Sequence, residues 1–515
     1  MQEMIDQKVQ LSPQQRRVWQ LQPQDAEQPQ PYRSRCVVSL EGRLDRAVLR
    51  LALQSVVERF EVLRTAFHAS HGAEQAPVQV VVAGDLSEFS EQDLSDLQTD
   101  EQRAAVETLY AELGRGQFEL EEGNVLRGSL LILSPMQHVL LLSLPSLCAD
   151  AATLGILVKE IGVSYALLVE GDRPSGEPLQ YTVISEWLNE LLDAEEAAAG
   201  RAYWRELKTA DLSALKLPFE RTPPDARTFA PEHFSIQIDD ELTKQLAATA
   251  QRVGVTETVF LLACWQTLLW RLGGYPEITI GACFDGRINE ELTNEIGLLA
   301  KYLPVRLPLA DDARFSDLLQ QADAATREAA DWQECFDWNL FNPAHEESST
   351  ESSAPYTPYC FEFEQLPQKQ LAGGIEFTVE RQDACLDRFK VKLSCLRATD
   401  SLRVEFHYDP LFYRRQHMTL LSDYFRELLG GAASAPDTHV GSLPLLTPKE
   451  QQRMLGEWNA TGREYAGTQL LHEMFEQQVA RTPDAVAVRF EHQHVSYAVL
   501  NERANQLAHE LQELG

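Results

Sequence analysis

Three side chains that can take part in chemistry stand in one seven-residue stretch, Pro-Ser-Leu-Cys-Ala-Asp-Ala, at residues 145–151. Ser146 offers a hydroxyl that can hydrogen-bond an amine, but it has no basic pKa near 7 and cannot hold the amine's proton. Cys148 offers a thiol, yet no His or Lys stands beside it in the sequence to favour the thiolate, so a buried, inert thiol is the favoured interpretation. Asp150 offers a carboxylate, which can form an ion pair or act directly in chemistry.

The sequence around this stretch predicts a strand, a tight loop and a helix. Residues 139–144 are an apolar run typical of a buried strand, and residues 152–165 have the pattern of a helix. Loops held between such elements often carry catalytic side chains. Further helices are expected at residues 44–67, 177–192 and 255–272, and strands at residues 126–133 and 276–283. This alternation predicts an α/β or mixed α+β fold.

The composition restricts the classes of partner. The 515 residues are too many for one ordinary core, and two or three folded units are expected. The formal charge of −33, from 45 Lys and Arg against 78 Asp and Glu, disfavours nucleic acid and anionic membrane surfaces as partners. No signal peptide and no run of about 20 apolar residues is present. The eight cysteines form no CxxC pair, so we expect a reducing, cytoplasmic location and no metal site.

Several stretches divide the chain. Residues 84–107 and 346–355 are polar and are expected to be mobile loops, and residues 430–440 are expected to mark a domain boundary. A linker is predicted at residues 445–468. After it, a helix near Leu470, a strand–turn–strand and a last helix at residues 501–514 follow, and this segment is too small to close a core by itself.

Four stretches carry recognisable motifs. Residues 11–19 read Leu-Ser-Pro-Gln-Gln-Arg-Arg-Val-Trp, and residues 59–67 read Arg-Phe-Glu-Val-Leu-Arg-Thr-Ala-Phe. Gln-Tyr at residues 180–181 precedes Trp187, and Gly-Arg at residues 286–287 precedes Ile-Gly-Leu-Leu-Ala-Lys-Tyr-Leu-Pro at residues 296–304. In this order and spacing they resemble the first, second, fourth and fifth motifs of the condensation domain of non-ribosomal peptide synthetases. Residues 471–475, 481–488 and 495–500 resemble the opening of an adenylation domain.

The resemblance covers nearly the whole chain and implies a fold of two chloramphenicol-acetyltransferase-like lobes that form a V with a central tunnel. It places the N-lobe at residues 1–175, the C-lobe at 176–444, a linker at 445–468 and the start of an adenylation domain at 469–515. It implies carrier domains as partners, upstream in trans and downstream in cis, and the chain's own adenylation domain. No cofactor bound by these residues is expected; the phosphopantetheine of the carriers would enter as a tethered substrate arm.

The family's active-site motif is His-His-x-x-x-Asp-Gly, and residues 145–151 occupy its positions. Both histidines and the glycine are missing; Ser146 stands where the second histidine would be, and Asp150 alone matches. Loss of a general base typically lowers a rate by about 10²–10⁴-fold, although positioning of the reactants can survive that loss. We therefore expect amide formation to be impaired or altered, and the domain to act as a docking or gating platform.

Two alternatives stay open from the sequence. One is an active acyl transferase that forms an amide without histidine. The other is a divergent heterocyclisation domain, because the Asp-x-x-x-x-Asp-x-x-Ser pattern of that relative falls on Pro145, Asp150 and Thr153, with the first Asp missing.

Ser146 and Asp150 are thus the candidate catalytic positions, and Pro145, Cys148 and Ala151 are expected to support them structurally. The resemblance also implies that Asp150 forms an ion pair with an arginine that holds the loop, and Arg64 and Arg287 are the candidates.

Overall fold

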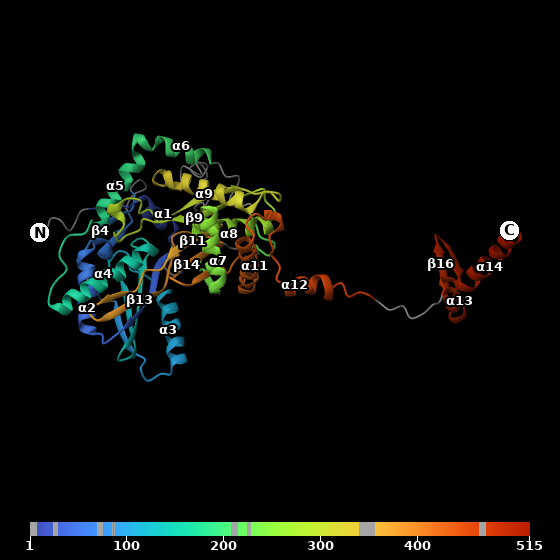
Figure 1. The fold of residues 1–515 in the computed structure, drawn as a ribbon, viewed down its shortest axis with the longest axis horizontal. Coiled ribbons are helices and arrows are strands. Elements are labelled where there is room, and N and C mark those ends of the chain that lie inside the picture. The colour runs from blue at the N-terminus through green and yellow to red at the C-terminus, as the bar shows by residue number, and fades with distance from the viewer. Residues whose placement is uncertain are drawn as a thin grey trace. The chain divides into compact units, whose positions relative to one another are not determined.

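The computed structural model describes residues 8–23, 29–69, 76–84, 86, 88–207, 215–223, 228–338, 356–462 and 470–515. The chain divides into two compact units, Met1–Thr447 and Pro448–Gly515, which are drawn as ribbons in Figure 1. The loop predicted at residues 346–355 lies outside the described residues. In the described part of the first unit, two six-stranded sheets and a three-stranded sheet are covered by helices.

The first six-stranded sheet has the order β12-β13-β2-β7-β6-β5. Its strands are β2 (Arg33–Glu41), β5 (Phe89–Asp93), β6 (Arg127–Ser134), β7 (Gln137–Pro145), β12 (Gln370–Ala372) and β13 (Ile375–Ala384). Alternating side chains of β7 enter two different cores: Leu140 and Leu142 lie in the cluster that contains α2 (Arg46–Arg59) and α4 (Ala151–Glu170), whereas Leu141 lies in the cluster that contains α3 (Thr99–Leu113). The helices therefore cover opposite faces of this sheet.

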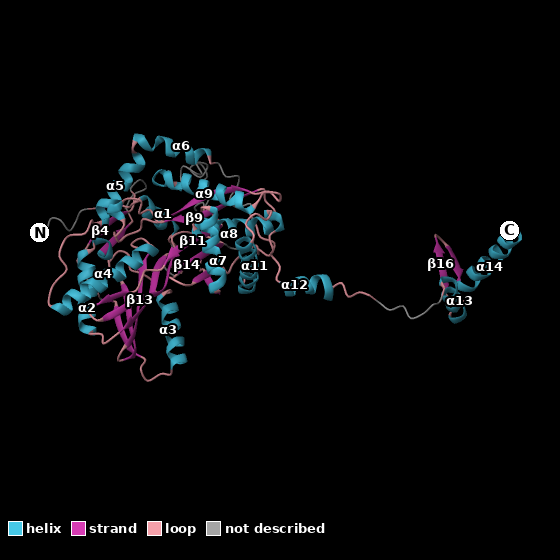
Figure 2. Cartoon of the chain, in the orientation of Figure 1, coloured by secondary structure: helices cyan, strands magenta, loops and turns pink. Residues whose placement is uncertain are grey.

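Two strands of that sheet come from the second half of the chain. β13 pairs antiparallel with β2, and β12 pairs with β13. Figure 2 labels β13 among the strands of the first unit. Residues 370–384 thus leave the second lobe and complete the sheet of the first, so the spatial division of the structure differs from the sequence boundary expected after residue 175. Pairing between strands this far apart leaves no trace in a local hydrophobic pattern.

The second six-stranded sheet has the order β10-β9-β11-β14-β15-β8. Its strands are β8 (Glu232–Ile238), β9 (Glu277–Phe284), β10 (Lys301–Pro308), β11 (Tyr359–Gln365), β14 (Val391–Arg397) and β15 (Leu402–Tyr408). A core forms between this sheet and α7 (Asp240–Val253), α8 (Glu257–Gly273), α9 (Phe315–Asp331) and α11 (Arg415–Ser434). The prediction of a buried helix at residues 255–272 is confirmed, since residues 259–270 of α8 are all buried.

Three smaller predictions are wrong. The helix expected at residues 44–67 ends at Arg59; a 3₁₀ turn (Glu61–Arg64) and strand β3 (Thr65–His68) follow, and buried apolar residues continue through all three elements, so the pattern does not show the break. Residues 84–107, expected to be a mobile loop, contain β5 and the start of α3. The boundary expected at residues 430–440 lies inside the first unit, because Val440 is fully buried.

The three-stranded sheet has the order β1-β4-β3, with β1 at Val9–Gln10 and β4 at Val78–Val81. Three more helices of the first unit are α1 (Pro13–Leu21), α5 (Tyr181–Asp193) and α6 (Ala198–Glu206).

α4 has 20 residues and a mean hydropathy of 1.6, so it is long and apolar enough to cross a membrane. α7 and α8 together pass the same test of length and composition, but they are bent by 102° relative to each other. In this structure α4 packs against α2 and the first sheet as a helix of the core.

The second unit begins inside the predicted linker. α12 (Pro448–Gln452) and a π-helical turn (Arg453–Glu457) occupy part of it. α13 (Leu471–Arg481), the hairpin β16 (Val486–Phe490) and β17 (Gln493–Ser496), and α14 (Tyr497–Glu513) follow the predicted helix–strand–strand–helix order. Neither α13 nor α14 buries any residue, and Leu471 and Phe490 are 87% and 70% exposed. Residues 470–515 thus have apolar faces but close no core among themselves.

Candidate functional site

The seven-residue stretch forms the connection between β7 and α4, as the sequence predicts. β7 ends at Pro145, where it pairs with Arg33 of β2. The backbone N–H of Cys148 donates to the Pro145 carbonyl (2.9 Å) and closes a turn. Ala151 is the first residue of α4, and Asp150 caps the helix by accepting a hydrogen bond from the Thr153 N–H (2.8 Å). Strand end, turn and helix start therefore fix the loop on both sides.

Ser146 lies inside the protein and is fully buried. Its N–H donates to the Tyr32 carbonyl (3.0 Å), and its hydroxyl donates to the carbonyl of Cys385 (2.9 Å), the residue that follows β13. The hydroxyl proton is thus used in a bond to the backbone of the crossing segment.

Cys148 is also fully buried, and burial raises the pKa of its thiol well above the usual value. A buried thiol is inert as a nucleophile because the thiolate is the reactive form. Asp150 is therefore the one charged residue of the loop, since Pro145, Leu147, Ala149 and Ala151 have no ionisable side chains.

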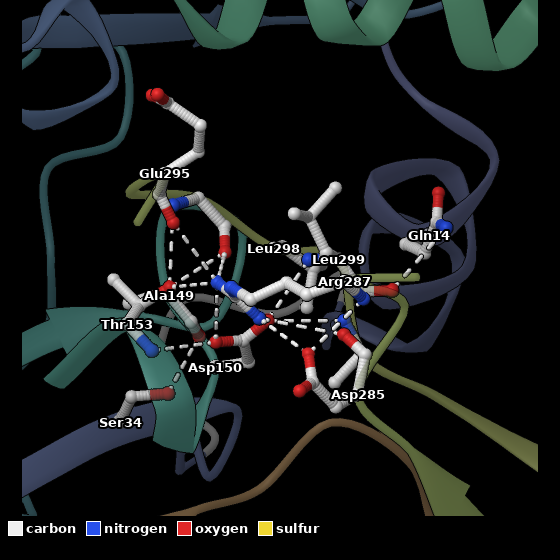
Figure 3. A network of polar contacts seen from close by, with 12 residues as sticks. Gln14, Ser34, Ala149, Asp150, Thr153, Asp285, Arg287, Glu295, Leu298 and Leu299 are labelled. Atoms are coloured by element: carbon white, nitrogen blue, oxygen red, sulfur yellow. Dashed lines mark hydrogen bonds and ion pairs between the residues drawn. The ribbon is translucent and has the colours of Figure 1, made fainter. Parts of the chain in front are cut away.

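Within the 145–151 loop, Asp150 makes the densest set of polar contacts (Figure 3). Its Oδ2 and Oδ1 accept hydrogen bonds from the two terminal nitrogens of Arg287 (3.0 and 3.1 Å). Oδ2 also accepts from the backbone N–H groups of Leu299 and Ala300 (2.9 and 3.0 Å). The carboxylate is therefore fully engaged by donors that belong to the protein.

The charges of this pair explain its titration. Burial alone would raise the pKa of Asp150, but the charge and hydrogen bonds of Arg287 and the backbone donors outweigh it, so the pKa is lowered. Burial would lower the pKa of Arg287, and the charge of Asp150 reverses that effect and raises the pKa. Both groups are held in their charged forms.

Of the two candidate arginines, the structure places Arg287 and not Arg64 on Asp150. Arg64 ends the 3₁₀ turn before β3 and donates to the Val82 carbonyl (2.9 Å). Arg287 is buried and donates also to the carbonyls of Glu295 (3.1 Å) and Gly297 (3.2 Å). It therefore joins the start of α4 to the segment between β9 and β10.

Thr153 takes part in the same hydrogen-bond network. Its hydroxyl donates to the Gly297 carbonyl (2.7 Å) and accepts from Arg287 (2.9 Å) and from the Gly297 N–H (3.2 Å). The pattern that suggests a heterocyclisation domain therefore falls on a proline at a strand end and on two residues with structural contacts.

Residues of the sequence motifs surround the loop. Gln15 of α1 donates to the Leu147 carbonyl (3.0 Å), and the Ser12 hydroxyl lies 2.9 Å from the hydroxyl of Tyr181 on α5. Tyr181 in turn donates to the Leu298 carbonyl (2.6 Å). The first, fourth and fifth motifs thus converge on the 145–151 loop, which the sequence order alone does not reveal.

Sequence reasoning misses two contacts. Ser34 of β2 donates its hydroxyl proton to the Ala149 carbonyl (2.6 Å), and the Cys385 carbonyl accepts from Ser146. Neither residue lies in a recognisable motif, and both act through strand pairing that is long-range in sequence.

Two cavities lie near the loop. The larger has a volume of about 570 Å³. It is lined by residues of α4 (Ala152, Gly155, Ile156, Val158, Lys159), of β13 (Phe377, Val379, Gln382), of the stretch from the end of β11 to the start of β12 (Gln365, Pro367, Gln368, Lys369, Gln370) and of the segment after β9 (Asp285, Arg287, Thr293). The smaller, of about 70 Å³, lies beside α1 and includes Gln14, Arg17 and Trp338 in its wall. None of residues 145–151 lines either cavity. Among the described residues, no group of three or more His, Cys, Asp or Glu is arranged to hold a metal ion.

Comparison with known proteins relates this architecture to one family. Residues 5–455 match the family described as "Condensation domain". A linear gramicidin synthase of Brevibacillus parabrevis is 30% identical over 485 residues, which are 92% of this chain and 9% of that protein. A dimodular nonribosomal peptide synthase of Bacillus subtilis (strain 168) is 29% identical over 97% of this chain and 21% of its own length. The chain therefore spans about a tenth to a fifth of these two relatives.

Solved structures share the fold. The condensation domain from the monacolin K polyketide synthase MokA has a TM-score of 0.73 and 19% identity, over 84% of this chain and 99% of that domain. The X-domain of teicoplanin biosynthesis, solved in complex with OxyB, has a TM-score of 0.68 and 21% identity, over 86% of this chain and 96% of that one. With the motif residues gathered around the 145–151 loop and the family match over residues 5–455, this chain belongs to the condensation domain family of non-ribosomal peptide synthetases.

Proposed function

We propose that this condensation-type domain does not form amide bonds by the histidine route and serves as a docking and gating platform within a peptide synthetase. The observation that carries the proposal is the position of Ser146. Its hydroxyl is buried and donates to the Cys385 carbonyl at 2.9 Å, so the place of the family's second histidine holds neither a base nor a residue that lines the two cavities described above.

The 145–151 loop has no group that is able to accept a proton from an amine near neutral pH. Serine has no basic pKa near neutrality, Asp150 is saturated by Arg287 and backbone donors, and Cys148 is held as a thiol. A missing general base lowers a rate by about 10²–10⁴-fold.

The retained framework supports the docking part of the proposal. The motif residues hold the loop although its chemistry is changed, and the fold keeps a cavity of about 570 Å³ beside α4. A protein of the same fold, the teicoplanin X-domain, was solved in complex with another protein, OxyB. By analogy, the partners proposed here are carrier domains, with a phosphopantetheine arm as the tethered group, upstream in trans and downstream in cis.

We also propose that residues 469–515 begin an adenylation domain. The exposed apolar side chains of α13, β16 and α14, among them Leu471, Phe490 and Leu511, are the faces that the rest of such a domain would cover. In addition, similarity to the Bacillus subtilis synthase extends over 97% of this chain, although the condensation family match ends at residue 455.

One assay tests the platform. A full synthetase module containing this domain is combined with loaded donor and acceptor carriers, and the acceptor is analysed by mass spectrometry; in parallel, binding of each carrier to residues 1–447 is measured by calorimetry. We expect carrier binding together with an amide yield that does not change when residues 1–447 are removed or when Ser146 is replaced by Ala.

Two results would overturn the proposal. Amide product that requires residues 1–447 would show that the domain is an acyl transferase with a histidine-independent mechanism. Absence of binding by both carriers would remove the docking role.

A further inference from the structure

The 145–151 loop lies between the two cavities described above. The walls of these cavities have no residue in common. Oδ2 of Asp150 accepts a hydrogen bond from Arg287 (3.0 Å), which lines the larger cavity. The same oxygen accepts another from the N–H of Ala300 (3.0 Å), which lines the smaller one. The Asp150 carboxylate therefore joins the wall of one cavity to the wall of the other.

The other half of the loop makes a similar connection. Ser146 donates its hydroxyl proton to the Cys385 carbonyl (2.9 Å). Along the chain, Cys385 stands between Gln382, which lines the larger cavity, and Leu386, which lines the smaller one. Residues 146–150 are all 0% exposed, so not even a water molecule reaches them from either side. The loop thus leaves no opening between the two cavities, and a group in either cavity does not touch it.

The two cavities differ greatly in volume, with about 570 Å³ for the larger and about 70 Å³ for the smaller. One water molecule takes up about 30 Å³ of the liquid, so the smaller cavity offers the space of about two waters. A phosphopantetheine arm is a chain with two amide groups and a terminal thiol, and it needs far more space than that. Only the larger cavity therefore has room for such an arm.

Side chains that are bound to one another surround the smaller cavity. Arg17 of α1 donates to both carboxylate oxygens of Asp387 (3.0 and 2.6 Å), and its guanidinium lies over the Trp338 ring, 4.6 Å from the ring centre. Tyr302 is 3% exposed, and its hydroxyl donates to Glu362 (3.0 Å). The ion pair of Arg17 and Asp387 is buried, with side chains 10% and 6% exposed. Widening the cavity would separate these two charges, which is strongly unfavourable for a buried pair.

The wall of the larger cavity combines apolar surface with a free hydrogen-bond acceptor. Ile156, Phe377 and Val379 contribute carbon atoms on which the methylene and methyl groups of an arm can pack. Gln382 is 4% exposed, and its Oε1 has no hydrogen-bond partner among the residues that the structure describes. An amide N–H of the arm would supply the donor that this buried oxygen lacks.

We propose that this domain accommodates a single tethered arm: the arm of one carrier enters the cavity between α4 and β13, and no arm enters the cavity beside α1. The inference rests on the platform role proposed above and specifies it. Two arms are then never brought into one space, so a donor thioester and an acceptor amine do not meet inside the domain. The separation of the cavities is a second reason, independent of the missing base, why amide formation is not expected.

Disulfide trapping of the free arm tests the proposal on the full chain. Val379→Cys places a thiol in the wall of the larger cavity, and Val18→Cys makes the same substitution in the wall of the smaller one, at positions that are 6% and 1% exposed. Each variant is incubated with pantethine, the disulfide of pantetheine. The cysteine thiolate forms an S–S bond with one pantetheine, and the other leaves as a thiolate that takes up a proton.

Modification is followed by intact-protein mass spectrometry, with the wild type giving the background of the eight native cysteines. Each rate is divided by the rate with methyl methanethiosulfonate, a much smaller reagent. We expect pantethine to modify Val379→Cys at least about tenfold faster than Val18→Cys on this scale. Leu188→Cys, a second position in the wall of the smaller cavity, should behave like Val18→Cys. A cysteine there that resists both reagents supports the same conclusion.

Three results would overturn the proposal. They are equal normalised rates at the two cavities, faster modification at the smaller cavity, and no modification of Val379→Cys by pantethine above the wild-type background. Because no carrier takes part, the outcome does not depend on carrier docking. A failure of the platform role would instead appear as absence of carrier binding in calorimetry, so the two failures are distinguishable.

Discussion

The carboxylate of Asp150 and the guanidinium of Arg287, 137 residues apart in sequence, meet in a two-pronged ion pair with contacts of 3.0 and 3.1 Å. The side chains are 0% and 4% exposed. The pair ties the first turn of α4 to the segment between β9 and β10, which carries the fifth sequence motif. Asp150 therefore connects two parts of the fold that are distant in sequence.

Asp150→Ala should destabilise the first unit by about 3–5 kcal/mol, because it leaves the buried Arg287 charge and two backbone N–H groups without an acceptor. Chemical denaturation followed by circular dichroism measures the change. Asp285→Ala is the control, since that carboxylate also contacts Arg287 (3.1 Å) but is 63% exposed, and its loss should change the unfolding free energy by less than about 1 kcal/mol. An unchanged denaturation midpoint in Asp150→Ala would contradict the structural role.

The same carboxylate predicts a pH dependence. The pKa of Asp150 is lower in the folded protein than in the unfolded chain, where it is about 3.9. The stability it contributes is therefore present in full above that unfolded value and is lost as the pH falls through the folded pKa. The difference in unfolding free energy between the wild type and Asp150→Asn should be constant from about pH 5 to 7 and should shrink at lower pH. A difference that does not vary with pH in the acid range would show that charge is not the source of the effect.

A histidine introduced at position 146 should not raise amide formation. Position 146 is fully buried, and an imidazole there would overpack the contact with the Cys385 carbonyl. Ser146→His should therefore lose about 1–3 kcal/mol of unfolding free energy and give no gain in amide product in the module assay. Ser146→Ala, which removes a single hydrogen bond, should lose about 1 kcal/mol. A stable Ser146→His variant with increased product would show that the loop is able to open toward substrate.

Gly297 is predicted to be irreplaceable for steric reasons. A Cβ at this position would lie 2.0 Å from Cδ2 of Tyr181, the residue that links α5 to Ser12 and to the Leu298 carbonyl. Gly297→Ala should lower the unfolding free energy by at least about 1–3 kcal/mol, measured by denaturant titration. In the control Gly430→Ala, on α11, a Cβ would meet nothing within 4 Å, and stability should be unchanged or raised by up to about 1 kcal/mol. Equal effects of the two substitutions would rule out the contact with Tyr181 as the cause.

Local signals in the sequence are enough to predict the elements that hold the loop. The apolar run before Pro145 predicts β7, and the pattern after Asp150 predicts α4, because both elements bury regular faces. The end of α2 at Arg59 escapes such a prediction because the buried residues of the next turn and strand continue the helical pattern. Strand β5 and helix α3 are not predicted either, because most of their residues are exposed and polar, as in a loop.

Contacts between distant segments are beyond such signals. The sequence leaves Arg64 and Arg287 as equal partners for Asp150, and only the chain path after β9 brings one of them to α4. In the same way, the Ser146 bond to Cys385 depends on β13 crossing to β2. A sequence motif can thus identify a site residue, but it does not identify the residue that the site residue contacts.

The crossing of residues 370–384 into the first sheet has a practical meaning for anyone who recombines synthetase genes. If two parent sequences were joined near residue 175, the first six-stranded sheet would take β12 and β13 from one parent and its other strands from the other parent. A splice after Thr447 leaves the strands of both six-stranded sheets with their native neighbours, so hybrid enzymes assembled at that junction should inherit an intact first unit.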